Sequence, residues 1–462
     1  MRVLESRINM DHNISFRWLL RFAFPTIIAT VFMNIYSVVD GIFVARLVST
    51  DALSAVNIVS PLISIVSGIG MMFGSGGNAL IARKIGEGKE KEAREDFSML
   101  LLTAFVFSVS LAIIGFLFLS PICRVLGSDE ALLGYCSEYM FPVLIAIPFT
   151  VFGSVFHMSF ITVGKAGFGL MLSVLGGVLN IVLDWLFIAV FGMGLSGAAI
   201  ATSIGYVASS LIGLVWFAIK RDQVLHLVRP KWRTSTLWKS CMNGSSEMVS
   251  VLAFSVVSIL FNNILMRLAG SDGVAALTII LYTQGLFSAL FRGYSMGISP
   301  VVSYNLGKQD KDRLSGLFSI SMKTIGATTL VVVAASYLLG GSVVSIFSGN
   351  SPTVYDMSLH GFRIVAASYL MLGTNIFSSA WFTALNDGKT SAILSFCRTI
   401  VFLVLPVLIL PRFFKLDGVW LSMAAGETMS LVMTVYYFLK HKNRWRLHTV
   451  LTPLSTDSQS RG

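Results

Sequence analysis

The sequence predicts an all-α polytopic membrane protein, with twelve membrane-spanning helices in two six-helix bundles around a central cleft. Of the 462 residues, 55% are hydrophobic and only 12% are charged, and the mean hydropathy is +0.78. A soluble domain carries about 25% charged residues, so this chain cannot cover a soluble surface. Its apolar runs are continuous and reach the ~20 residues that cross a bilayer, whereas the strands of a membrane β-barrel alternate in polarity.

Polar, Gly and Pro breaks divide the apolar sequence into twelve predicted spans. They cover residues 17–45, 52–80, 97–119, 139–161, 168–191, 194–219, 240–266, 274–302, 317–340, 358–384, 390–413 and 416–439. Pro25 lies inside the first span and predicts a kink there, because proline lacks the N–H that a helix needs. The polar first residues contain no short apolar segment with a cleavage site, so we expect no removed signal peptide.

Positive charge alternates between the two sides of the predicted membrane region. The N-terminal tail, every second loop and the C-terminal tail hold most of the 34 Lys and Arg residues. The opposite loops hold only Arg46, Arg124, Arg267, Arg363, Arg412 and Lys415. By the positive-inside rule, both termini are therefore expected in the cytoplasm. This topology also explains the net charge of +11, so we expect no nucleic-acid partner.

The two halves of the chain resemble each other when the sequence is shifted by 221 residues. Identical pairs at this offset include Asp51/Asp272, Gly76/Gly297, Gly86/Gly307, Gly197/Gly418 and Gly205/Gly426. An even number of spans in each copy means that both copies enter the membrane from the same side. This is the parallel repeat of some secondary transporters, and a substrate is expected in the cleft between the copies.

The repeat sets the predicted domain boundaries. They give a cytoplasmic tail at 1–16, an N-terminal bundle at 17–219, a basic cytoplasmic connector at 220–239, a C-terminal bundle at 240–439 and a cytoplasmic tail at 440–462.

The chain lacks the sequence signs of an enzyme. The four cysteines have no metal-ligand or redox spacing. There is also no nucleophile–base pair within a span and no Gly-x-x-x-x-Gly-Lys-Ser/Thr loop for a nucleotide. We therefore expect no catalytic residues, no cofactor and no structural metal.

Three segments resemble the multidrug and toxic compound extrusion (MATE) family. They are "FPTIIATVFMNIYSVVDGIFVARL", "GGNALIARKIGEGK" and "LNIVLDWLFIAVFGMGLSGAAIATSIG", and the similarity covers about residues 15–440. The chain is most similar to the bacterial branch that carries its acids in the N-terminal bundle. The resemblance implies an ion-driven exporter of amphipathic, often cationic, small molecules that alternates between outward-open and inward-open states and uses no ATP. We expect a multi-pass monomer in the cytoplasmic membrane.

Two acids lie deep in the N-terminal bundle. Asp184 is the only charged residue between Phe168 and Phe191, and at 1.5 Å per residue it lies roughly 24 Å from the cytoplasmic end of its span. Asp40, near the end of the first span, falls at a similar height. A charge at this depth costs at least ~2.5 kcal/mol, so the acids are candidates for ion coupling.

Polar side chains accompany both acids at helical spacing. Tyr36 precedes Asp40 by four residues, Asn180 precedes Asp184 by four, and Thr202 and Tyr206 form a third such pair. Residues spaced by four lie on one helix face, so three helices present polar groups at comparable depth.

The acid pair predicts a site that exchanges a proton. Burial and a second nearby acid both disfavour the charged form of a carboxyl group, which the binding of H⁺ relieves. Na⁺ is the alternative, because Asn180, Thr202 and the acids offer several oxygen ligands. A purely structural interpretation, in which each Asp anchors its helix by hydrogen bonds, remains open.

Further charges fall within the predicted C-terminal bundle. Glu247 lies in span seven, Glu427 in span twelve and Arg292 in span eight, where the arginine could neutralise either acid as a structural ion pair. Some relatives carry functional acids in this bundle, but span ten contains no acid here. Met33 and Asn34, close to Tyr36, join Glu247 and Glu427 as candidates for the substrate cleft.

A flippase for a lipid-linked cell-envelope precursor is the alternative function within the same superfamily. Such a protein needs a cationic cleft to hold a diphosphate. The deepest charges identified here are mainly acids, which favours cationic cargo.

Overall fold

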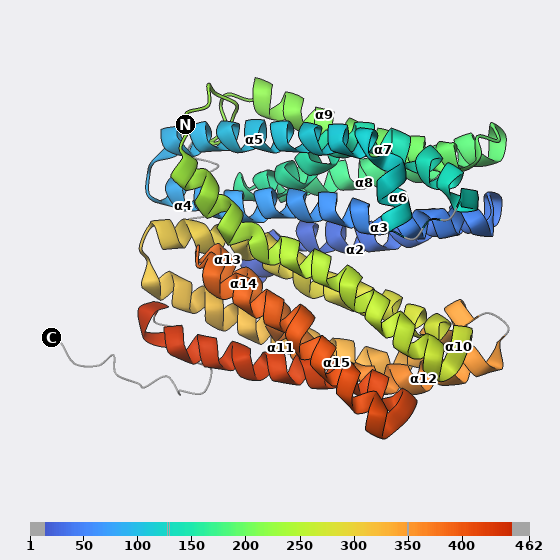
Figure 1. The fold of residues 1–462 in the computed structure, drawn as a ribbon. Coiled ribbons are helices and arrows are strands. Elements are labelled where there is room, and N and C mark those ends of the chain that lie inside the picture. The colour runs from blue at the N-terminus through green and yellow to red at the C-terminus, as the bar shows by residue number, and fades with distance from the viewer. Residues whose placement is uncertain (1–13, 127, 129, 349–350, 446–462) are drawn as a thin grey trace.

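The computed structural model describes residues 14–126, 128, 130–348 and 351–445, with the backbone alone described for residues 37–47, 50, 51, 53, 131, 346, 347 and 443–445. Every regular element in these ranges is helical, as the sequence predicts. The helices form two bundles, which Figure 1 separates into a blue-to-green unit and a unit that runs from the yellow-green of α10 to red.

The N-terminal half runs from the first described helix to the connector. Its elements are α2 (Phe16–Leu47), α3 (Thr50–Met71), η1 (Met72–Gly76), α4 (Gly77–Gly86), α5 (Glu90–Leu117), α6 (Leu119–Val125), α7 (Glu130–Thr162), α8 (Ala166–Asp184), η2 (Trp185–Val190) and α9 (Gly194–Ile219). The elements η1 and η2 are π-helical turns inserted into longer helices.

The C-terminal half repeats this arrangement in longer helical elements. Its elements are α10 (Thr234–Gly307), α11 (Lys311–Ser348), α12 (Pro352–Ala366), α13 (Tyr369–Ala384), α14 (Gly388–Phe396), η3 (Cys397–Val401) and α15 (Phe402–Trp445). Here η3 is the inserted π-helical turn.

Within the described residues the helices account for the twelve predicted crossings. Nine helices are long and apolar enough to cross a membrane, and the bent pair α12–α13 makes a tenth. Two of the nine contain a break with non-helical torsions, at Gly270 in α10 and at Lys415 in α15, and are therefore two helices each. Gly270 takes a φ of 63° at its break, a conformation that glycine adopts without steric cost.

Two predicted boundaries differ from the structure. Span ten, predicted as one helix over 358–384, bends by 58° between α12 and α13. At the bend the Ser368 hydroxyl donates to the Val365 carbonyl, and neighbouring backbone bonds tighten to i→i+3. The connector is also shorter than the predicted 220–239, because α10 begins at Thr234. A helix forms its own backbone hydrogen bonds and can therefore continue beyond the apolar run.

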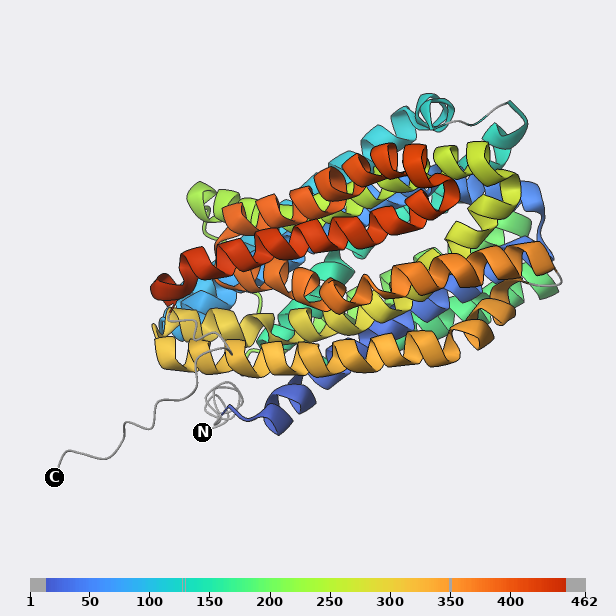
Figure 2. The same cartoon turned by 90° about the horizontal axis from the view of Figure 1, so that it is seen from below.

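Each bundle has its own hydrophobic core, and two elements cross between them. Leu19 and Ala23 of α2 pack in the core of the C-terminal bundle, while Tyr304 of α10 packs in the core of the N-terminal bundle. Figure 2 shows α2 running beside the C-terminal helices near the N-terminus. The helix α2 therefore joins the two bundles.

The bundles meet backbone to backbone near the end where α4 finishes and α10 begins and ends. A methyl group added at Gly86 would overlap the carbonyl oxygen of Tyr304, and one added at Gly307 would overlap that of Arg83. A methyl group at Gly244 would overlap the carbonyl oxygen of Met72 in the same way. Small residues allow helix backbones this close together. The basic connector lies at this end, so the structure is closed on the side predicted to be cytoplasmic.

Ion pairs hold the connector (residues 220–233) against α5. The Arg233 guanidinium pairs with Asp96, at 2.7 Å, and with Glu95, while Lys84 donates to the same Asp96 carboxylate. Asp96 is buried. Two cations thus share one buried acid at the junction of the connector with the N-terminal bundle.

Asp96→Asn is expected to destabilise the protein. The change leaves Lys84 and Arg233 without their shared negative partner, and hydrogen bonds to charged groups contribute about 1.5–3 kcal/mol each. A thermal melt of purified protein should show a drop of several degrees. Asp222→Asn is the control, because Asp222 is exposed in the same connector and bonds only to Gln223 among the described residues. Equal melting temperatures for the two variants would contradict the anchoring role.

Candidate functional site

Close packing of α2, α8 and α9 brings the predicted ion-coupling residues together. A methyl group added at Gly205 of α9 would lie 2.7 Å from the Gly176 carbonyl oxygen of α8. One added at Gly177 would lie 2.5 Å from the Phe32 ring of α2. Glycine at these three positions lets the helices approach until their polar side chains meet.

Hydrogen bonds between described side chains cross between these helices at two places. The Asn180 side-chain amide donates to the Thr202 hydroxyl at 3.1 Å. The hydroxyl groups of Tyr36 and Tyr206 lie 3.4 Å apart and share a hydrogen bond. Each bond joins residues that the sequence analysis singled out on different helices.

Asp184 lies fully buried at the end of α8, with an exposed fraction of 0%. The π-helical turn η2 begins at the next residue, Trp185. Such turns are frequent at functional sites, because the wider turn re-aims side chains. Asp40 lies in α2, but its side chain is outside the described residues, so its distance to Asp184 stays a prediction.

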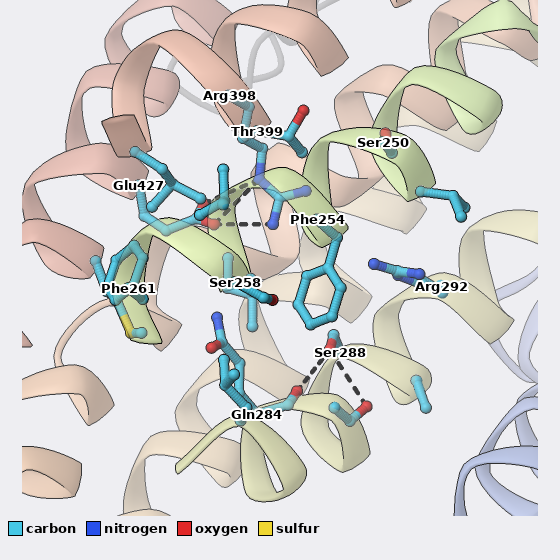
Figure 3. A pocket seen from close by; sticks show the side chains of 18 of the residues that line it. Ser250, Phe254, Ser258, Phe261, Gln284, Ser288, Arg292, Arg398, Thr399 and Glu427 are labelled. Carbon is cyan, nitrogen blue, oxygen red and sulfur yellow. Dashed lines mark hydrogen bonds and ion pairs between the residues drawn. The ribbon is translucent and has the colours of Figure 1, made fainter. Parts of the chain in front are cut away.

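A cavity of about 360 Å³ lies mainly in the C-terminal bundle and reaches the N-terminal one. Its polar lining includes Asn34, Ser64, Gln284, Arg292, Arg398 and Glu427. The aromatic rings of Phe254 and Phe261 line the same space (Figure 3). A volume of this size suits a small organic molecule.

Glu427 is held in an ion pair by Arg398. The guanidinium donates two bonds to one carboxylate oxygen, at 2.8 and 3.1 Å, and a third to the other oxygen. Asn375 donates to that second oxygen at 2.7 Å. Of the two pairings expected for Arg292, the one with Glu427 is therefore wrong, because Arg398 of η3 binds both oxygens of that carboxylate.

Arg292 extends into the cavity from α10 and is exposed there (Figure 3). Over the described ranges it makes no hydrogen bond or ion pair. The charges that act on it through space are those of Glu247, which attracts it, and Arg398, which repels it.

The four predicted cleft residues separate into two groups. Asn34 and Glu427 line the cavity, whereas Met33 and Glu247 do not. Asn34 lies opposite Gly285 of α10, while Tyr36, two residues further along α2, contacts α8 at Gly177. Residues two apart point to nearly opposite sides of a helix. The helix α2 therefore lies between the cavity and the polar cluster of the N-terminal bundle.

Sequence reasoning missed Arg398, which lies within predicted span eleven. The available signal was a lone arginine inside the apolar run 390–413, eight residues from its start. Three helical turns of apolar residues follow it, which places the charge inside the membrane rather than beside it.

Comparison with known proteins supports the helical fold of this chain and its class, that of membrane transporters. A sequence model of the MatE family matches residues 25–186 and 248–408, one stretch in each half of the chain. The multidrug export protein MepA of Staphylococcus saprophyticus is 23% identical over 433 residues, which cover 92% of this chain and 94% of that protein.

Solved structures show the same architecture. A MATE protein in complex with MaL6 superposes with a TM-score of 0.90 at 23% identity, over 96% of this chain and 99% of that one. A multidrug resistance MATE family transporter of the MOP superfamily, solved in an outward-facing conformation, superposes with a TM-score of 0.88 at 23% identity, over 93% and 96%.

Proposed function

Because the chain belongs to the MatE family, we propose that it exports amphipathic small molecules by antiport against H⁺ through alternating access. The chain is a multi-pass membrane transporter rather than an enzyme. In this proposal the protein acts as a monomer in the cytoplasmic membrane, with both termini in the cytoplasm. The observation that carries the coupling is the full burial of Asp184 beside the Asn180–Thr202 and Tyr36–Tyr206 pairs.

Proton binding suits this polar cluster. Burial disfavours the charged form of a carboxyl group, so Asp184 gains from a proton whenever α2, α8 and α9 are tightly packed. Na⁺ would instead need oxygen ligands around it. The Asn180 carbonyl oxygen, which accepts no hydrogen bond from the described residues, is one such ligand, and the experiment below separates the two ions.

Coupling to the cavity runs through α2 in this proposal. Protonation favours tight packing of α2 on α8 at the Tyr36 level, and the same movement repositions Asn34 at the cavity wall. Pro25 provides the place where α2 can bend, because its missing N–H leaves the carbonyl four residues earlier without its helical hydrogen bond. A ligand shifts such an equilibrium only through different affinities for the two states, and the proton supplies that difference.

A flippase for a lipid-linked diphosphate is less well supported. Of the two arginines in the cavity, Arg398 is occupied by Glu427, which leaves Arg292 alone to face a group that carries several negative charges. A diphosphate site would need more cations than this.

Transport in proteoliposomes tests the proposal. Purified protein should move a fluorescent amphipathic dye when a pH gradient is imposed and Na⁺ is absent. Dye movement that needs a Na⁺ gradient and ignores the pH gradient would replace H⁺ by Na⁺. A lack of dye movement, together with transfer of a lipid-linked diphosphate between leaflets, would favour the flippase.

A further inference from the structure

We propose that the cavity binds amphipathic molecules that carry a carboxylate, and that Arg292 binds this carboxylate while the exposed ring of Phe254 contacts the apolar body. The inference rests on the proposed export function and names a class of cargo for it. It differs from the sequence-based expectation of mainly cationic cargo.

The described wall of the cavity carries a net positive charge. Its charged lining residues are Arg292, Arg398 and Glu427, so the wall has one more positive than negative charge. Glu427 is fully engaged, because its two oxygens accept from Arg398 and Asn375. The excess positive charge is therefore that of Arg292.

Arg292 lacks a polar partner among the described residues. Its guanidinium has no ion pair or hydrogen bond to any residue that the structure describes, although it lies in an apolar helix. Charged residues in membrane spans usually pair with one another or face a water-filled space. Arg398 satisfies the first condition and Arg292 the second.

Glu247 is the competing partner for this guanidinium. Its charge attracts Arg292, which lowers the cost of keeping the arginine in the membrane. Glu247 does not line the cavity, however, and forms no ion pair with Arg292 in the described structure. The face of the guanidinium towards the cavity is thus open to a ligand.

The remaining lining matches an amphipathic acid. A guanidinium presents parallel N–H groups that fit the two oxygens of a carboxylate. Gln284, Ser258 and Ser288 add hydrogen-bonding groups, and the exposed ring of Phe254 provides an aromatic face for a flat ring system (Figure 3). One anionic group on an aromatic body fits this set, whereas a purely cationic dye leaves Arg292 unmatched.

A matched pair of dyes tests the inference. Rhodamine 110 carries a benzoate that is ionised at neutral pH, and rhodamine 123 is its methyl ester, so the pair differs only in the carboxylate. Binding to the native full-length protein in lipid nanodiscs is measured by fluorescence anisotropy. We expect the acid to bind more tightly than the ester. Arg292→Gln should weaken binding of the acid by about tenfold and change binding of the ester little.

Two further variants guard against misfolding and general charge effects. Arg292→Lys keeps the positive charge but loses the paired N–H groups, so its affinity for the acid should fall between those of the native protein and Arg292→Gln. Arg267→Gln removes one positive charge from an exposed residue of α10 that does not line the cavity, and it should leave the preference unchanged.

The outcomes separate this inference from the export function. Tighter binding of the ester by the native protein, or an equal loss of both dyes in Arg292→Gln, would overturn the carboxylate site. If the native protein transports the ester but shows no preference for the acid, export stands and the inference fails. If the acid binds through Arg292 but neither dye is moved in proteoliposomes, the carboxylate site stands and the export function fails.

Discussion

Export driven by a pH gradient is expected to fall to the level of empty liposomes when Asp184 is replaced by Asn. The amide has nearly the same shape as the protonated carboxyl group but cannot release a proton. Asp184 is fully buried, so the variant should keep the packing of α2, α8 and α9 while losing the exchange that drives the cycle. Since Asn imitates the protonated state, substrate affinity in this variant should also stop changing with pH.

The matched control for this experiment is Asp272→Asn, which alters an acid at the break of α10, far from the polar cluster in sequence. Both variants should insert and melt like the native protein, so that a loss of export in Asp184→Asn alone reports on coupling. Native rates of pH-driven export by Asp184→Asn would remove the coupling role and leave Asp184 as a polar anchor of α8.

The polar cluster of the N-terminal bundle was accessible to sequence reasoning because its signal is local. A residue such as Asp184 is conspicuous against an apolar run, and a partner four residues away shares its helix face. The structure places Asn180 against Thr202 and Tyr36 against Tyr206. The sequence predicted only that these side chains lie at a similar depth. The structure shows which of them form hydrogen bonds across the helices.

The cavity was less predictable because its key contacts are not local. Arg398 and Glu427 are 29 positions apart and meet only because η3 and α15 pack together. Their pairing leaves Arg292 without an ion pair among the described residues, which is the observation behind the proposed carboxylate site. Pairing partners depend on tertiary packing, whereas the sequence indicates only that Arg292, Arg398 and Glu427 lie in apolar spans.

The close contacts between the bundles follow from the internal repeat. Gly86 lies against Tyr304, and Gly307 lies against Arg83. Gly307 lies 221 positions after Gly86, and Tyr304 lies 221 positions after Arg83. This is the same offset that relates the two halves of the sequence. The two contacts are therefore copies of one another about the axis between the bundles. Such a paired contact closes one end of the cleft symmetrically, and under the proposed alternating access it opens in the inward-facing state.

Gly86→Ala is expected to favour separation of the bundles at this end. Within α4 the change should be mildly stabilising, because alanine is the better helix former by up to ~1 kcal/mol. The added methyl group, however, overlaps the backbone oxygen of Tyr304, which cannot move aside like the end of a side chain. Overpacking costs about 1–3 kcal/mol. A penalty of that size, borne only by the closed arrangement, lowers its population by roughly 5- to 150-fold relative to the open one.

Spin labels at the exposed residues Lys91 and Lys311, in a background without the four native cysteines, would measure the separation. Gly86→Ala should shift the distance distribution to longer values and slow export, because a transporter held open at one end completes fewer cycles. Gly307→Ala should also lengthen the distances and slow export, since it disturbs the corresponding contact with Arg83. The control is Gly316→Ala in α11, where a methyl group meets nothing within 4 Å. If Gly86→Ala and Gly316→Ala give the same distances, the contact does not hold the end closed, and closure must come from side chains around it.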